Sequence, residues 1–309
     1  MTRVLVTGGG GFCGKHLVAY LQKQGVEVYT VGVQPAIGQS KKHYSIADIT
    51  SVEALSSVLK SVEPNYVFHL AGVASAPEPS QFYQVNASYA AALLRALELT
   101  GQLPDCPTML VGTSAEYGFI TPEQVPIHEK TPVSPYHHYG ISKLAQTHIG
   151  MAAARTRMPV VMVRPFNIIG CGMGSHLALQ SFARQVTNIL QGKQDPVIEV
   201  GNLGSSRDFI DVGDVIPIYW QLIQNPDAYG EVINVCSGQG VVMSDLLQKL
   251  IEIAAVEVEV RSDPSRMKAL DIPVHYGCTK KLESLIGDTP ELNLDATLKQ
   301  ILEQSIADA

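Results

Sequence analysis

Tyr139 and Lys143 form the residue pair in this sequence that is best suited to proton transfer. They belong to the stretch Tyr139-Gly-Ile-Ser-Lys143, which follows a proline-containing loop and has helical character. Residues i and i+4 share one face of a helix, so the phenol and the ammonium group can lie side by side. A free tyrosine titrates near about pH 10, and a lysine charge beside it lowers that pKa. The pair alone is common on surface helices, so its meaning depends on the motifs around it.

A glycine-rich turn near the start of the chain has the pattern of a dinucleotide site. Gly8, Gly11 and Gly14 follow the apolar run Val4–Val6 and precede a helical pattern. Glycines let the backbone approach a pyrophosphate, whose charge meets exposed N–H groups and the positive end of the helix dipole. A turn that only packs helix on strand is the alternative, which this context disfavours.

The end of the second predicted strand, Val26–Val31, bears on the choice of cofactor. A carboxylate there would bind the ribose hydroxyls of NAD and repel a 2′-phosphate. The sequence instead has Gly32 and Gln34, with Lys41 and Lys42 as the nearest cations and no arginine beside them. We therefore expect NADP(H) as the favoured cofactor and NAD(H) as the alternative.

The elements that must position these motifs are short apolar runs that alternate with helical patterns. This alternation predicts an α/β fold, a doubly wound parallel sheet of Rossmann type whose strands are buried on both faces. The other predicted strands are Tyr66–Leu70, Met109–Val111, Val160–Val163 and Glu231–Cys236, and long helices are expected over about 81–99, 139–155 and 244–254.

The alternation weakens after Pro165, where glycine, asparagine and charged residues become denser. The strand at Glu231–Cys236 nevertheless predicts a return to the main sheet. We therefore expect a dinucleotide-binding domain from residues 1–165 plus 207–238. Residues 166–206 plus 239–309 are expected to form a smaller, discontinuous substrate domain.

The composition and the charge bear on the class of protein, on its partners and on its location. Hydrophobic residues make up 46% and charged residues 17% of the 309 residues, as in ordinary globular proteins. A net charge of −7 gives no field that would hold nucleic acid. The five cysteines lack Cys-x-x-Cys spacing, which favours reduced thiols and no metal site. Neither a signal peptide nor an apolar run of about 20 residues is seen, so we expect a cytoplasmic protein with no membrane contact.

Together the motifs resemble the extended short-chain dehydrogenase/reductases, the NAD-dependent epimerase/dehydratase family, over nearly the whole chain. The glycine turn, Thr113–Gly118 and the Tyr–Lys pair occur in the family's order. Further matching segments are His69–Gly72, Arg164–Gly170, Arg207–Asp214 and Asn234–Gly238. The segments that resemble the GDP-mannose branch, whose reductases make GDP-rhamnose from GDP-6-deoxy-4-keto-mannose, are Phe182–Gln185, Val200–Leu203 and Asp263–Arg266.

The resemblance implies roles for individual residues. Tyr139 is expected to be the catalytic acid/base, Lys143 to lower its pKa and hold the nicotinamide ribose, and Thr113 to bind the oxygen at sugar C4. Hydride addition builds negative charge on that oxygen, which a phenol and a hydroxyl can stabilise. The implied cofactor contacts are Gly8, Gly11, Phe12, Gly14, Asp48, Ile49, Leu70, Ala71, Gly72, Tyr139 and Lys143.

Local cations must hold the substrate's phosphates, because the overall negative charge repels them. The resemblance implies that Arg207 and Arg266 lie near the diphosphate and that Asn167 contacts it or the sugar, while Arg184 is a candidate that a solvated surface charge explains equally well. Two interpretations of Asn86 are equally well supported, a functional role in the site and a structural role as a capping or buried amide.

Two substrate-facing loops depart from the pattern of the GDP-mannose branch. Lys268–Asp271 replaces an Arg-Pro before the aspartate, and Gly170-Cys-Gly172 replaces Gly-Pro-Gly. Glu116 also stands where the branch has an aliphatic residue. The base or the sugar of the substrate therefore need not be that of GDP-rhamnose.

The main prediction is NAD(P)H-dependent reduction of the C4 keto group of a nucleotide-linked 6-deoxy-4-keto-hexose. A 4,6-dehydratase or decarboxylase needs an acid where this chain has Ala115, and Glu116 points the other way in an extended segment. A 4-epimerase uses the same catalytic residues but retains NAD, which Gly32 disfavours. Intact catalytic residues disfavour a dinucleotide-sensing protein. A homodimer through the helices over 81–99 and 139–155 is expected.

Overall fold

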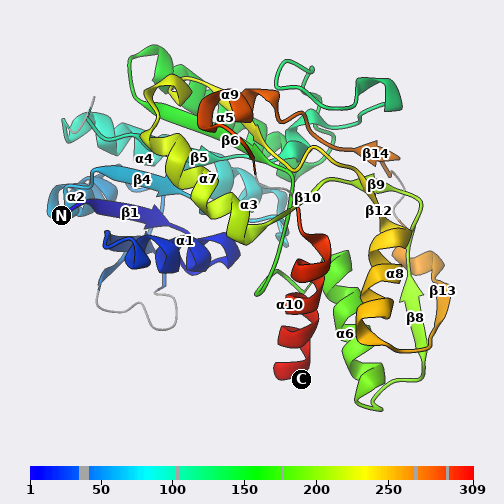
Figure 1. Ribbon diagram of the computed structural model, residues 1–309. Coiled ribbons are helices and arrows are strands. Elements are labelled where there is room, and N and C mark those ends of the chain that lie inside the picture. The colour runs from blue at the N-terminus through cyan, green and yellow to red at the C-terminus, as the bar shows by residue number, and fades with distance from the viewer. Residues whose placement is uncertain (35–41, 102–104, 176, 268–270, 290–291) are drawn as a thin grey trace.

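A seven-stranded, wholly parallel sheet forms the centre of the computed structural model, which describes all residues except 35–41, 102–104, 176, 268–270 and 290–291 (Figure 1). Its strand order is β11-β6-β5-β4-β1-β2-β3, with the change of direction beside β1 that is typical of doubly wound folds. The strands are β1 (Arg3–Thr7), β2 (Glu27–Gly32), β3 (His43–Ser45), β4 (Tyr66–His69), β5 (Thr108–Val111), β6 (Val160–Pro165) and β11 (Val232–Val235). The predicted fold class is confirmed, and the short edge strand β3 is an addition to it.

Helices cover both faces of this sheet because its strands are apolar on both sides. Val4 and Val6 of β1 pack toward one layer and Leu5 toward the other, and all three are fully buried. The first layer consists of α1 (Phe12–Lys23), α7 (Val212–Gln224) and α9 (Lys280–Ile286). The second layer consists of α2 (Val52–Val62), α4 (Tyr89–Leu99) and α5 (His138–Arg155).

The helix predicted over 81–99 is interrupted. The structure has α3 (Pro79–Tyr83), then a π-helical turn over Gln84–Ser88, and then α4. Within this widened turn the buried Asn86 amide bonds to both backbone polar groups of Val73, at 2.8 and 3.0 Å, and to Ser142 Oγ at 2.9 Å. These bonds stabilise the irregular turn against α5, and they favour the structural explanation of Asn86.

A second hydrophobic core lies outside the main sheet, in the lobe at the lower right of Figure 1. It is formed by α6 (Ala178–Leu190), β8 (Val197–Val200), α8 (Met243–Ala254) and α10 (Leu294–Ala307), with β13 (Glu259–Ser262) pairing parallel to β8. The short strands between this lobe and the sheet are β7 (Asn167–Ile169), β9 (Ser206–Arg207), β10 (Phe209–Asp211), β12 (Val241–Val242) and β14 (Val274–His275). The domain boundaries given above stay a prediction.

The structure also describes the state of the cysteines and the apolar character of the helices. All five cysteines are free, and burial raises the pKa of Cys13 and of Cys106 to about 12. Over the described ranges, no helix combines the length and the apolar character needed to cross a membrane.

Candidate active site

Helix α5 brings Lys143 to the carboxyl end of β5. The Lys143 side chain is buried, and its Nζ donates to the carbonyl of Val111 at 2.7 Å and to Gln146 Oε1 at 3.1 Å. Gln146 also donates to the Val111 carbonyl, at 2.9 Å. Burial lowers the pKa of Lys143 to about 8. The ammonium group is therefore fixed at the point where β5 leads into the Thr113 loop.

The Thr113 hydroxyl lies close enough to the Tyr139 phenol to lower its pKa. Thr113 follows β5 and caps a 3₁₀ turn over Ser114–Tyr117, where its hydroxyl accepts the N–H of Ala115 at 3.3 Å. In this structure burial raises the pKa of Tyr139, the Thr113 hydroxyl lowers it, and Lys143 is not among the groups that shift it. The three residues predicted to be catalytic thus come together.

Glu116 is fully buried and is not free to act as a base. Its Oε1 accepts the N–H of Thr113 at 3.0 Å, and its Oε2 accepts from Thr147 Oγ1 at 2.9 Å and from Arg164 Nε at 2.8 Å. The segment is a 3₁₀ turn, so the predicted extended geometry, on which the orientation of Glu116 depended, is wrong. In the structure both carboxylate oxygens of Glu116 accept hydrogen bonds.

In the glycine turn between β1 and α1, backbone segments lie too close together to admit side chains. Gly8 has φ +70°, and a Cβ added there would lie 2.6 Å from the backbone nitrogen of Ala71. A Cβ added at Gly14 would clash with the Gly8 carbonyl oxygen. Helix α1 starts with no side-chain cap and no acidic residue in its first turn, so its first N–H groups are available to a pyrophosphate. These residues fit a dinucleotide cofactor.

The remaining predicted cofactor residues lie along the same edge of the sheet. Leu70–Gly72 follows β4 and contacts Gly8, and a Cβ at Gly72 would lie 3.1 Å from Lys143 Nζ. Phe12 is the first residue of α1. Asp48 and Ile49 follow β3. The Asp48 carboxylate accepts hydrogen bonds from the hydroxyl and the backbone N–H of Thr50, at 2.7 and 2.8 Å.

The end of β2 has no acidic residue over Gly32–Gln34. Lys42, expected to be a nearby cation, lies at the other end of β2, where its Nζ pairs with Glu27 at 2.7 Å and stands 5.3 Å from the Tyr29 ring centroid. The parallel register of β2 and β3 explains this position, because it sets Lys42 beside the start of β2. Lys41 lies outside the described residues.

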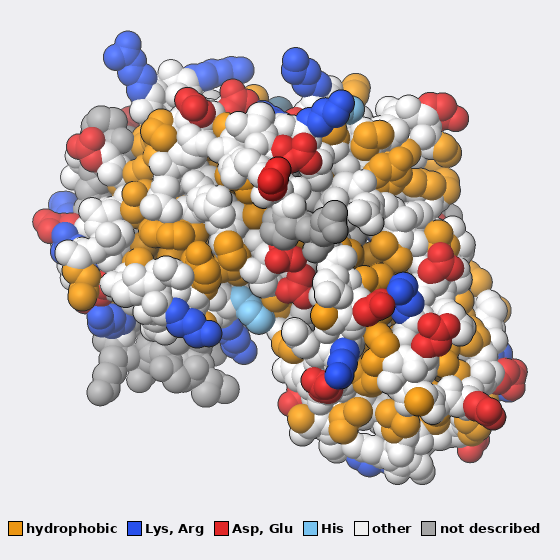
Figure 2. All heavy atoms as spheres, viewed as in Figure 1, with side chains coloured by type: hydrophobic (Ala, Val, Ile, Leu, Met, Phe, Trp, Pro, Cys, Tyr) orange, Lys and Arg blue, Asp and Glu red, His pale blue; other side chains and the backbone are white. Residues whose placement is uncertain are grey.

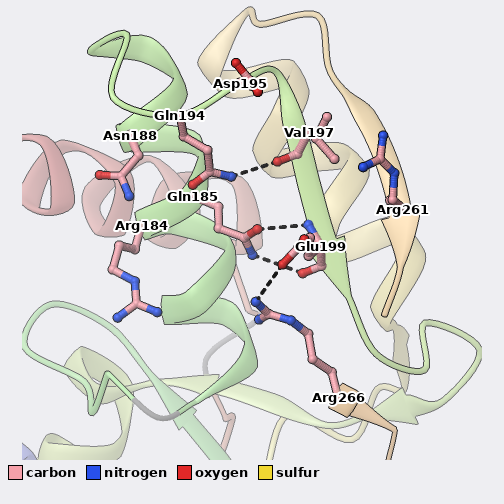
Figure 3. A pocket seen from close by; sticks show the side chains of 9 residues that line it. All are labelled: Arg184, Gln185, Asn188, Gln194, Asp195, Val197, Glu199, Arg261 and Arg266. Atoms are coloured by element: carbon pink, nitrogen blue, oxygen red, sulfur yellow. Dashed lines mark hydrogen bonds and ion pairs between the residues drawn. The ribbon is translucent and has the colours of Figure 1, made fainter. Parts of the chain in front are cut away.

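A polar cavity of about 520 Å³, here called the α6–β8 cavity, lies in the second lobe (Figure 3). Gln185 of α6 bonds to the backbone N–H and carbonyl of Glu199 in β8, at 2.8 and 3.1 Å. Arg266 pairs with Glu199 at 3.2 Å, whereas Arg184 has no ion-pair partner within the described part of the chain. The lining residues are Arg184, Gln185, Asn188, Gln194, Asp195, Val197, Glu199, Arg261 and Arg266.

Two predicted substrate residues lie outside this cavity, on the strands that join the lobe to the sheet. Arg207 pairs with Asp271 at 2.6 Å and donates to the carbonyls of Ser206 and Ile272 at 2.8 and 2.6 Å. Asn167 donates to the backbone carbonyl of Asp208 at 2.7 Å. Contact of these two side chains with the substrate stays a prediction.

One buried group beside the site, His275, belongs to no motif that the sequence shows. His275 of β14 lies close enough to the backbone of Ser114, the residue after Thr113, to be influenced by it, and its ring centroid lies 5.3 Å from that of Phe166. Burial lowers the pKa of His275 to about 4, so the imidazole is neutral near pH 7. No local spacing connects this residue to its partner, which is why the sequence gives no signal.

Comparison with known proteins gives relatives that match this geometry. The model of the NAD dependent epimerase/dehydratase family matches residues 4–236. The chain is 35% identical to the GDP-6-deoxy-D-mannose reductase of Pseudomonas aeruginosa, over 97% of this chain and 96% of that protein. It is 30% identical to the GDP-6-deoxy-D-talose 4-dehydrogenase of Aggregatibacter actinomycetemcomitans, over 93% of this chain and 92% of that protein.

A solved structure extends the similarity to the whole fold. The structure of RMD from Pseudomonas aeruginosa complexed with NADPH superposes with a TM-score of 0.87 and 31% identity, and the match covers 100% of both chains. Sheet and second lobe are therefore shared between the two proteins.

Proposed function

The chain belongs to the NAD-dependent epimerase/dehydratase family, and we propose that it reduces the C4 keto group of a nucleotide-linked 6-deoxy-4-keto-hexose with NAD(P)H. The proposed substrate is GDP-6-deoxy-4-keto-mannose and the product is GDP-rhamnose, in line with the named activity of the P. aeruginosa relative. The observation that carries the proposal is that α5 brings Tyr139 and the buried Lys143 to the end of β5, where Thr113 begins the next turn.

We propose a separate task for each of these side chains. NADPH, when bound, supplies the hydride that is added to C4. Tyr139 gives its phenolic proton to the oxygen that becomes the C4 hydroxyl, and Thr113 donates a hydrogen bond to the same oxygen. The two hydroxyls lie close together, so each can turn its single proton toward the same substrate oxygen. Lys143 brings a positive charge to this end of β5, where negative charge develops during the reduction.

We propose NADP(H) as the favoured cofactor and NAD(H) as the alternative. Gly8, Gly11 and Gly14 would hold the pyrophosphate against the start of α1, and the loop Leu70–Gly72 would line the cofactor. The lack of an acid over Gly32–Gln34 supports a cofactor with a 2′-phosphate, because nothing there repels that group.

The proposed site for the nucleotide of the substrate is the α6–β8 cavity. Arg184 and Arg266 supply cations for a diphosphate, and Arg184 has no competing ion pair among the described residues. The carboxylates of Asp195 and Glu199 offer acceptors, and guanine presents adjacent N–H donors on one edge. This combination favours a GDP sugar.

A homodimer in the cytoplasm is the proposed assembly. Exposed residues of α4 and α5 support this proposal, namely the small residues Ala91 and Ala152 and Ile141, which is 38% exposed. Light scattering should give about twice the chain mass of 33.3 kDa. Ile141→Glu should shift the protein to the monomer, and a wild-type monomer would contradict the proposal.

The deciding experiment follows oxidation of NADPH and NADH by the purified protein with GDP-6-deoxy-4-keto-mannose. We expect rapid oxidation, faster with NADPH, and a GDP-rhamnose product identified by NMR. Inhibition by GDP should be stronger than inhibition by UDP, because the α6–β8 cavity presents carboxylates to the base. No oxidation of either cofactor, combined with turnover of an unreduced nucleotide sugar by protein that retains NAD, would favour a 4-epimerase instead.

A further inference from the structure

One buried carboxylate, that of Glu116, joins three elements of the candidate active site. Its Oε1 accepts the backbone N–H of Thr113 at 3.0 Å. Its Oε2 accepts from Thr147 Oγ1 on α5 at 2.9 Å and from Arg164 Nε on β6 at 2.8 Å. The Glu116 and Arg164 side chains are 0% and 5% exposed. The Thr113 loop is thereby bound both to the helix of the Tyr–Lys pair and to a strand of the sheet.

The point of attachment on α5 lies on the face that carries the chemistry. Tyr139, Lys143 and Thr147 follow one another at intervals of four residues, so they lie on one face of the helix. Gly112 precedes Thr113, and a Cβ added there would clash with the Glu116 carboxylate and lie 3.3 Å from Thr147 Oγ1. The loop backbone therefore lies directly on the bond between Glu116 and Thr147.

The Glu116–Arg164 ion pair is not explained by a contribution to the stability of the fold. Burial of two charges costs a large desolvation free energy, and an apolar pair of similar size is often equally stable. The Arg164 guanidinium also stacks on the Tyr117 ring, 4.8 Å from its centroid. An apolar side chain at position 116 would fill the space but would leave the N–H of Thr113 and the hydroxyl of Thr147 without this acceptor.

We propose that Glu116 is a positioning residue for the reduction, which holds the Thr113 hydroxyl against Tyr139 by anchoring the Thr113 backbone to α5. It acts through Thr113 and does not touch the reacting atoms, and the inference rests on the proposed function. The carboxylate has a second effect in the same direction, because its negative charge raises the pKa of Tyr139 and of Lys143 and so favours their protonated forms.

Glu116→Gln is the first variant to test. The amide oxygen can still accept from Thr113, but the NH₂ group then faces the donors of Thr147 and Arg164, which shifts the anchor. We expect kcat to fall about 10- to 100-fold, because small displacements of aligned groups have effects of this size, with KM for the keto sugar changed less than about threefold. An unchanged kcat in a folded variant overturns the proposal.

A double variant separates positioning from stability. Glu116→Leu with Arg164→Met removes both buried charges together, which retains folding, and it also removes the acceptor for Thr113. We expect a folded protein whose melting temperature falls only by the cost of the two donors left without an acceptor, and a kcat as low as that of Glu116→Gln. A kcat restored to the wild-type value would show that Glu116 only neutralises Arg164, and the proposal would fail.

Hydrogen exchange tests the anchor without any substrate. In Glu116→Gln the amides of residues 112–118 should exchange at least about tenfold faster than in the wild type, while those of β1, far from Glu116, keep their rates. Equal exchange in both proteins overturns the anchor. A wild-type protein that fails to reduce the keto sugar would count against the proposed function alone, because the exchange rates still decide what Glu116 does.

Discussion

Tyr139→Phe should lower kcat for reduction of the keto sugar by about 10²- to 10⁴-fold, the range that a positioned general acid contributes. The substitution removes the phenolic oxygen alone, so the C4 oxygen loses its proton donor while the Thr113 hydroxyl stays in place beside the ring. The ring remains, and with it the stacking on His137 at a centroid distance of 6.1 Å. We therefore expect a folded protein whose dissociation constant for NADPH, measured by fluorescence titration, changes less than about threefold.

Tyr136→Phe is the matched control for this prediction. Tyr136 stands three positions earlier, is 46% exposed, and loses the same hydroxyl. Its kcat should stay within about twofold of the wild type. If Tyr139→Phe behaves like Tyr136→Phe, the proton comes from another group, and the assignment of Tyr139 as the acid is wrong.

The parts of the fold that depend on local pattern could be predicted from the sequence. Strands such as β1 and β6 are buried on both faces, and such burial requires the continuous apolar runs that reveal them. The pairing of Tyr139 with Lys143 on α5 follows from helical periodicity in the same way. Both features depend on residues close together in the chain.

The features that the sequence did not predict depend on partners far apart in the chain. Thr147 and Arg164 are 31 and 48 residues from Glu116, and no spacing rule connects them. Because these two donors both lie in the core, the turn after Thr113 adopts the 3₁₀ form and buries the carboxylate. A propensity argument treats the segment as extended, since it contains no information about those donors.

Lys42 shows the same limitation at the surface. Its position beside Glu27 is set by the register between β2 and β3, which the sequence alone does not specify. Proximity in the chain therefore did not reveal that Lys42 lies away from the end of β2 where the cofactor is predicted.

Lys143→Met should lower kcat/KM by about 10²- to 10³-fold, the range expected when a preorganised donor that stabilises the reacting oxygen is removed from a buried site. Methionine has a similar length and no polar group. The Val111 carbonyl keeps the hydrogen bond from Gln146 at 2.9 Å, so no buried backbone group loses all its partners. The variant should therefore fold, and steady-state kinetics can be read directly.

The pH dependence of kcat/KM gives a sharper test of the role of Lys143. Burial lowers the pKa of Lys143 to about 8, so the ammonium group is charged below that pH and neutral above it. Because the proposed reduction needs the charge, wild-type kcat/KM should fall as the pH rises through about 8. The decline should be absent from Lys143→Met and retained in Lys60→Met, which removes an exposed lysine of α2. If kcat/KM of Lys143→Met fell at the same pH as in the wild type, a different group would be titrating, because that variant has no ammonium group at position 143.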